Sequence, residues 1–153
     1  MKVLHIINSL KFGGAEKLLS DSLPLYINKG INASVLTLNS EDTSFSENLE
    51  NKGVVVSKMN SPKSLYNPLH IFKLRQYLKS YDIIHVHLFP ALYWVAIASI
   101  FISKKIKIVL TEHNTENRRR KLFIFKLVDS YIYKRFSKVI AISTAAEINL
   151  KKH

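Results

Sequence analysis

The amino-acid sequence predicts an α/β domain in which helices cover both faces of a parallel sheet. Short apolar runs alternate along the whole chain with stretches whose apolar residues recur at three- and four-residue steps. The first pattern is typical of buried strands and the second of amphipathic helices, so their alternation favours parallel strand–helix–strand units. With 153 residues, 47% of them hydrophobic, the chain is long enough for one such Rossmann-like domain with its own core.

The strands are predicted where short apolar runs end in Gly, Asn, Ser or a charged residue. Six such runs cover residues 2–7, 33–38, 54–57, 82–87, 107–111 and 139–142. Helical patterns fill the intervals and cover residues 14–30, 45–51, 68–79, 88–102 and 117–136, and a last helix opens at Thr144. There, Thr144 and Glu147 have the spacing of a capping box. Residues 88–102 carry no charge, but a membrane span needs about twenty apolar residues, so a buried helix is expected.

Composition narrows the classes of protein that the chain can belong to. It contains no cysteine, which excludes disulfides and thiolate metal sites and fits a reducing cytoplasm. The apolar run near the amino terminus, from Val3 to Ile7, is too short for a signal peptide. We therefore expect a cytoplasmic protein.

Positive charge is concentrated in the last third of the chain. The net charge is +12: residues 1–100 hold 10 basic and 7 acidic residues, and residues 101–153 hold 13 and 4. An excess of this kind indicates an anionic partner such as phosphate groups, acidic lipid or nucleic acid, although a solvated basic face is also open. Nucleic acid is disfavoured because surface aromatic residues for base stacking do not alternate with the Lys and Arg residues.

Polar residues follow four of the predicted strands, at the sheet edge where ligands bind in folds of this type. They are the segment 8–14, His87, the segment 113–117 and Ser143. Gly13 and Gly14 precede a helix, where their small size lets the backbone approach an anion. The third glycine of a dinucleotide fingerprint is missing, because Lys17 occupies that region. A simple turn therefore remains the alternative to a phosphate contact.

Histidines form a second group of candidates. His85 and His87 lie two residues apart on one strand, so both project from the same face. Together with His113 they could make a three-histidine zinc site, but no carboxylate supports it, because alternation directs Glu112 away. Packing is the expected role of His85, and also of His5 in the middle of its strand. His87 and His113 lie nearer the edge and are expected to face a ligand.

A basic cluster opens the predicted helix 117–136. Arg118, Arg119 and Arg120 lie in its first turn, where the helix dipole disfavours each positive charge by about 0.3–1 kcal/mol. A docked anion would resolve this conflict. Further along, apolar residues gather on two nearly opposite sides of the helix, so a membrane, a partner or a further domain is expected to cover one of them, unless the domain itself hides both.

Taken in order, four motifs resemble the amino-terminal domain of family 4 glycosyltransferases. They are Gly13-Gly-Ala-Glu16, Asp82-Ile-Ile-His-Val-His87, Thr111-Glu-His-Asn114 and Val139-Ile-Ala-Ile-Ser143. The resemblance covers essentially the whole chain. It implies one half of a GT-B architecture, in which two Rossmann-like domains face each other across a cleft and transfer a sugar from a nucleotide-sugar donor, with retention of configuration and without a metal or other cofactor.

The resemblance also implies roles for individual residues. His113 matches the histidine that contacts the transferred sugar and is the expected catalytic residue. Gly13 and Gly14 would lie against the donor diphosphate and the acceptor. His87 matches a position near the acceptor pocket. Asn114, which ends the third motif, and Arg118, Arg119 and Arg120, which come from the basic cluster described above, are the remaining expected binding residues.

One feature of the family is absent. The two glutamates separated by seven residues belong to the carboxyl-terminal domain that binds the nucleotide sugar, and no such pair occurs here. Residues 1–153 are therefore interpreted as the acceptor-side domain alone, which we expect to be inactive by itself. The whole enzyme is expected to be a hexosyltransferase that acts on a glycan or lipid-linked acceptor in cell-surface polysaccharide synthesis. An anionic inner membrane face is a further expected partner. Half of a GT-B sugar epimerase, or a basic nucleic-acid-binding or metal-binding α/β domain, are the alternatives.

Overall fold

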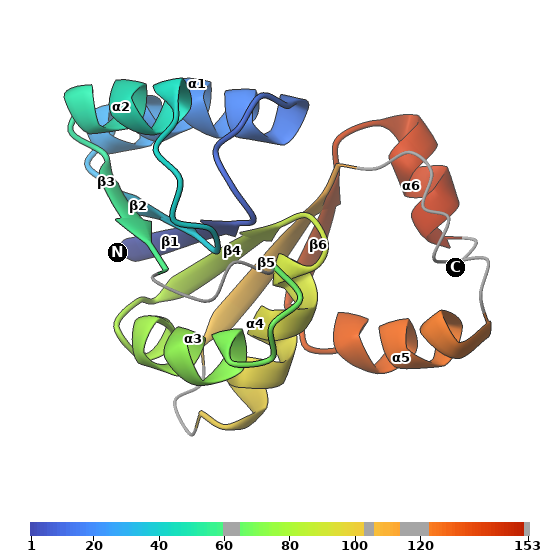
Figure 1. Ribbon diagram of the computed structural model, residues 1–153. Coiled ribbons are helices and arrows are strands. Elements are labelled where there is room, and N and C mark those ends of the chain that lie inside the picture. The colour runs from blue at the N-terminus through green and yellow to red at the C-terminus, as the bar shows by residue number, and fades with distance from the viewer. Residues whose placement is uncertain (60–64, 103–105, 114–122, 152–153) are drawn as a thin grey trace.

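The computed structural model describes residues 1–59, 65–102, 106–113 and 123–151. Its central element is a six-stranded sheet in which every strand pairs in parallel with its neighbours (Figure 1). The strands are β1 (Lys2–Ile7), β2 (Asn32–Thr37), β3 (Val55–Lys58), β4 (Ile83–His87), β5 (Lys107–Glu112) and β6 (Lys138–Ala141). Their order, β3-β2-β1-β4-β5-β6, is that of a Rossmann sheet, and it reverses between β1 and β4.

Two cores lie on opposite faces of this sheet. The helices are α1 (Gly14–Asn28), α2 (Ser44–Asn51), α3 (His70–Lys79), α4 (Ala91–Ile100), α5 (Phe123–Tyr133) and α6 (Thr144–Lys151). α1 and α2 cover one face, and α3 and α4 cover the other (Figure 1), where α5 adds Ile132 to the same core. Side chains that alternate along β1 contribute to both cores, since Leu4 and Ile6 face α3 and α4 while Ile7 faces α1. The predicted parallel sheet with helices on both faces is confirmed.

The register of β1, β4 and β5 brings the histidines to one face of the sheet. His5 pairs with His85 across β1 and β4, and His87 pairs with Thr111 across β4 and β5. Side chains two residues apart on a strand share a face. His5, His85 and His87 therefore project to the side that α1 covers, next to the reversal in strand order.

The helix predicted from residue 68 begins at His70, and the start predicted at residue 117 lies outside the described residues. Two other helix starts differ from the prediction for a physical reason. The uncharged helix begins at Ala91 and not at residue 88, because Leu88 has φ of 66°, a left-handed conformation that a right-handed helix cannot include. In α6 the capping residue is Ser143, whose Oγ accepts a hydrogen bond from the amide of Ala146 at 3.2 Å, so the expected Thr144 cap is wrong. As predicted, α4 is largely buried.

α5 has one covered side and one open side. Ile132 and Phe136 are buried against the sheet, whereas Leu127 and Tyr131 are 61% and 58% exposed. Among the described residues, packing therefore covers the side that carries Ile132 and leaves Leu127 and Tyr131 exposed on the other side.

Candidate functional site

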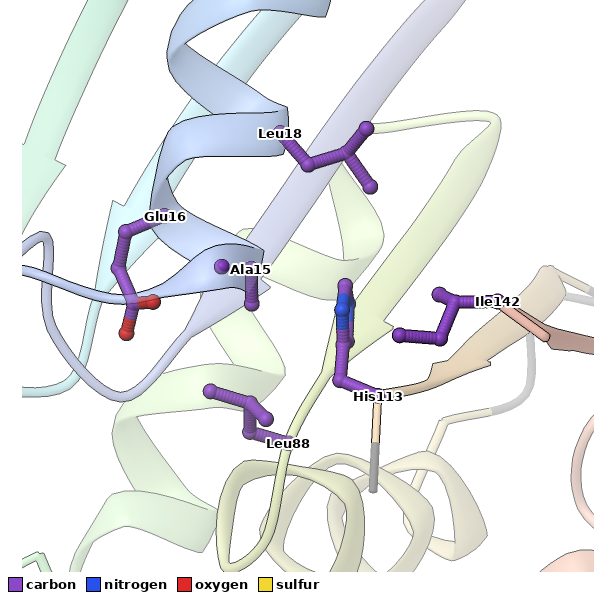
Figure 2. A pocket seen from close by; sticks show the side chains of 7 residues that line it. Ala15, Glu16, Leu18, Leu88, His113 and Ile142 are labelled. Atoms are coloured by element: carbon purple, nitrogen blue, oxygen red, sulfur yellow. The ribbon is translucent and has the colours of Figure 1, made fainter. Parts of the chain in front are cut away.

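A pocket of about 560 Å³ opens at the carboxyl ends of the strands, within the range of small-molecule sites. It lies beside the reversal in strand order between β1 and β4, where Rossmann-type sheets bind ligands. Its wall comes from the start of α1, the segment after β4, the end of β5 and the end of β6 (Figure 2). The lining residues are Gly14, Ala15, Glu16, Leu18, Leu88, His113 and Ile142.

The amino end of α1 forms one side of this pocket. Gly13 is the N-cap residue in an extended conformation, and no side chain caps the helix. A Cβ placed on Gly14 would meet no atom within 4 Å, so the backbone there is open to the pocket. A Cβ on Gly13 would instead lie 2.2 Å from Oε2 of Glu16, whose carboxylate folds back over the helix start. The helix dipole favours an anion at this end, and the Glu16 carboxylate would have to turn away to admit a phosphate group.

A hydrogen-bonded row of histidines leads from the sheet to the pocket. Nδ1 of His5 lies 3.2 Å from Nε2 of His87, and Nδ1 of His87 lies 3.1 Å from Nε2 of His113. His85 stands beside this row, with its ring centroid 4.4 Å from that of His87, and its Nε2 lies 2.7 Å from Oγ1 of Thr111. Strands β1, β4 and β5 thus align three imidazoles end to end, and His113 is the member that reaches the pocket.

Burial keeps these imidazoles neutral. It lowers the pKa of His5 to about 3, with a smaller contribution from His85, and it lowers the pKa of His85 to about 4. The pKa of His87 lies well below its ordinary value, again chiefly because the ring is buried. His113 is half-buried, and its pKa is lowered by desolvation while neighbouring Glu112 opposes the shift. At neutral pH the row therefore offers hydrogen bonds without positive charge.

The structure brings two of the predicted site residues together and separates others. Gly14 and His113 line the same pocket, although their sequence positions are far apart. His87 is only 1% exposed and lies beneath His113, which corrects the expectation that it faces a ligand directly. Gly13 lies at the helix start behind the lining. Asn114, Arg118, Arg119 and Arg120 fall outside the described residues.

Sequence reasoning missed the apolar wall of the pocket. Leu88 lines it in a left-handed backbone conformation that is uncommon for a branched residue and is often found at functional sites. Asn8 holds the neighbouring turn, because its Nδ2 donates to the carbonyl of Phe89 at 2.7 Å and its Oδ1 accepts from the amide of Ala91 at 3.2 Å. The position of Asn8 directly after β1 was the one sequence signal for this turn. Nothing in the sequence indicated that Leu88 would line a pocket.

The described histidines also have the spacing of a metal site, but not in the expected set. Ring nitrogens of His5, His85 and His87 lie within 4.8 Å of one another, whereas the sequence had suggested His113 as the third member. No carboxylate joins this set among the described residues. Glu112 lies on the other face of β5, where Tyr133 donates a hydrogen bond to it at 3.0 Å. Hydrogen bonds already occupy the nitrogens that join His5 to His87.

Comparison with known families shows where the chain belongs. The sequence model of Glycosyltransferase Family 4 matches residues 12–153, nearly the whole chain. The chain belongs to glycosyltransferase family 4. None of the curated proteins matches this family 4 chain in sequence.

Solved structures show the same fold. Alr3699/HepE from Anabaena, in complex with UDP and glucose, superimposes on this family 4 domain with a TM-score of 0.77 at 25% identity, covering 99% of this chain and 41% of its own. A glycosyltransferase from Rickettsia africae gives 0.75 at 19% identity, with coverage of 99% and 39%. The lipopolysaccharide outer core galactosyltransferase WaaB gives a TM-score of 0.71 at 16% identity, covering 99% of this chain and 42% of its own. The chain thus spans about two fifths of these proteins and has the fold of a GT-B half.

None of the described helices is both long enough and apolar enough to cross a membrane.

Proposed function

We propose that this chain is the acceptor-side domain of a retaining glycosyltransferase that moves a hexose from a nucleoside diphosphate sugar to a glycan or lipid-linked acceptor. The observation that carries the proposal is the pocket in which the amino end of α1 and His113 meet. A nucleoside diphosphate sugar needs both groups side by side. The helix end can bind the negative charge of the diphosphate, and the imidazole can hydrogen-bond the hydroxyl groups of the sugar. Membership of family 4 and the UDP and glucose bound to Anabaena HepE support this choice.

Each part of the pocket has a role in this proposal. The backbone at Gly14 lets a diphosphate approach the amides and positive dipole end of α1, which stabilise its charge. The neutral imidazole of His113 hydrogen-bonds the transferred sugar and orients it for attack. Leu88 and Ile142 give the pocket an apolar wall against which the sugar ring can pack.

The rest of the catalytic apparatus belongs to a second domain. In this proposal that domain follows residue 153, binds most of the nucleotide sugar and supplies the two spaced glutamates, so residues 1–153 alone are inactive. The length of Anabaena HepE supports this part of the proposal, because this chain covers only 41% of it. Synthesis of a cell-surface polysaccharide on the cytoplasmic side of the membrane is the proposed context.

Sugar transfer is tested with the longer protein that contains this domain. We expect it to consume UDP-glucose only when a glycan or lipid-linked acceptor is present, and proton NMR of the product should show the anomeric configuration of the donor. Residues 1–153 assayed in parallel should transfer nothing. An inverted product would overturn retention. Conversion of UDP-N-acetylglucosamine to its C2 epimer without acceptor would favour the alternative that the chain is half of a GT-B epimerase.

We expect neither zinc nor another metal to be needed. The histidine cluster is buried, neutral and hydrogen-bonded, so a divalent cation would enter a site without a compensating carboxylate. The purified chain should carry far less than one equivalent of zinc by elemental analysis, and added zinc should leave its melting temperature unchanged. One equivalent that survives dialysis, with a raised melting temperature, would contradict this prediction.

A further prediction concerns the inner membrane face. Near an anionic leaflet each of Arg118, Arg119, Arg120 and Lys121 contributes about 1 kcal/mol of binding free energy, and the exposed apolar side of α5 adjoins them in sequence. The domain should therefore co-sediment with anionic vesicles more than with neutral ones. Rising salt should weaken the association, because the Debye length falls from about 10 Å at 0.1 M to about 3 Å at 1 M.

A variant carrying glutamine at all four basic positions is the test of this cluster. It should lose the preference for anionic vesicles and keep the melting temperature of the parent chain. If the parent chain ignores anionic vesicles at low salt, the cluster binds a soluble anion, such as a phosphate of the acceptor, and membrane association is wrong.

A further inference from the structure

The row of histidines behind the pocket has a property that no single imidazole has. His5 in β1, His87 in β4 and His113 after β5 are joined end to end through ring nitrogens, each by one hydrogen bond of 3.1–3.2 Å. A nitrogen–nitrogen hydrogen bond needs one protonated partner and one partner with a free lone pair. The protonation pattern of one ring therefore dictates that of the next.

Only two arrangements satisfy both hydrogen bonds while the rings are neutral. In the first, Nδ1–H of His5 donates to Nε2 of His87, whose Nδ1–H donates to Nε2 of His113, so His113 carries its proton on Nδ1. In the second, every proton is moved to the other nitrogen, and His113 carries its proton on Nε2. Burial supports the neutral form of the row, because it lowers the pKa values of His5 and His87 below neutral pH.

The surroundings of His5 distinguish the two arrangements. Its Nε2 is buried and has no hydrogen-bond partner among the described residues. The second arrangement would place an N–H on this atom, and buried N–H groups without an acceptor are rare in proteins. The first arrangement leaves only a lone pair there, which is tolerated better. The first arrangement is therefore the stable one.

We propose that His5 and His87 are positioning residues that hold His113 as the Nδ1–H tautomer. His113 then accepts a hydrogen bond through Nε2 from within the protein and keeps Nδ1–H as a donor for a ligand oxygen. The use of this N–H donor in catalysis rests on the proposed sugar-binding role of His113. The tautomer of His113 does not depend on that role. Free neutral histidine in water prefers the opposite tautomer, so the fold imposes a state that His113 would not adopt alone.

Nitrogen NMR of the unliganded chain reads the tautomer directly. With histidines labelled by ¹⁵N, protonated and unprotonated ring nitrogens differ in chemical shift and in their couplings to ring protons, and the His113 signals are assigned by their loss in His113→Gln. At neutral pH we expect a protonated Nδ1 and an unprotonated Nε2 on His113, with the same pattern on His87. A protonated Nε2 on His113 would overturn the proposal.

Two substitutions separate positioning from packing. His5→Phe keeps an aromatic ring but removes the donor, so His113 should lose its single tautomer and show averaged shifts. His5→Asn can still donate from its amide and should restore the Nδ1–H pattern. Thr111→Val is the matched control, because it removes the hydrogen bond to His85 and leaves the row intact, and it should not alter His113.

Two further outcomes decide the proposal. An unaltered Nδ1–H tautomer in a folded His5→Phe variant would show that His5 does not control His113. If His5→Phe fails to fold, the wild-type spectrum decides alone. These spectra are recorded without any sugar donor or sugar acceptor. The results therefore do not depend on whether the longer protein transfers sugar. The expected tautomer in a protein without transferase activity would overturn the proposed function only.

Discussion

Replacing His113 with alanine in the proposed longer protein is expected to lower turnover about 10²-fold, because losing the group that orients the sugar misplaces the reacting atoms. The fold should survive, because His113 is half-buried at the mouth of a pocket and contributes to neither core. Its only hydrogen bond to a described residue is to Nδ1 of His87, and water entering from the pocket can replace that partner. Steady-state kinetics and a thermal unfolding curve measure the two effects.

Leu18→Ala is a suitable comparison, because Leu18 lines the same pocket but offers no hydrogen bond. It should cost much less turnover than His113→Ala. Wild-type kinetics in a folded His113→Ala protein would remove His113 from the reaction. An equal loss in both variants would show that the shape of the pocket, and not the imidazole, is what turnover requires.

Replacing Gly14 with valine is expected to weaken donor binding strongly while leaving the domain folded. The space beyond the α-carbon of Gly14 is empty of protein atoms, so a branched side chain fits without a clash but occupies the place of the diphosphate. Losing hydrogen bonds to a charged group costs about 1.5–3 kcal/mol each, so the Kd for UDP-glucose should rise about 10²-fold or more. Calorimetric titration of the longer protein measures this change.

Gly14→Ala and Gly53→Ala make the test specific. Alanine at Gly14, the first residue of α1, should leave the melting temperature unchanged or raise it, because glycine costs a helix about 0.5–1 kcal/mol relative to alanine. Gly53 has φ of 78° and does not line the pocket. Gly53→Ala should therefore destabilise the fold by about 1–2 kcal/mol and leave the Kd unchanged. Normal donor binding by Gly14→Val would exclude a phosphate contact at Gly14.

Local patterns were sufficient to predict the elements of this fold. Strand and helix periodicities depend on which residues avoid water, and this information is local, so the described strands and helices were placed within a few residues of their positions. The start predicted for α5 at residue 117 lies outside the described residues. The start of α4 was not predictable in this way, because the left-handed backbone of Leu88 is maintained by its surroundings, including the hydrogen bonds of Asn8 to the adjoining turn. Conformations imposed from a distance have no local signal.

For the pocket, the sequence identified Gly14 and His113 as candidates, because polar or small residues at strand ends meet at one edge of a parallel sheet. Their meeting in one pocket, and the burial of His87 beneath His113, depend on how β1, β4 and β5 align. The apolar wall could not be predicted, since Leu88 and Ile142 look like any core residue in a linear pattern.

The sequence by itself determined the class of fold, the family and the edge of the sheet that carries the site, because periodicity and short motifs are properties of neighbouring residues. Only the tertiary structure decided which histidines touch. Strand register brought His5 and His87, which lie 82 positions apart, within hydrogen-bond distance. Burial then left Nε2 of His5 without a hydrogen-bond partner among the described residues. Contacts between distant strands follow from packing of the whole sheet, and that packing turned separate histidines into one coupled row.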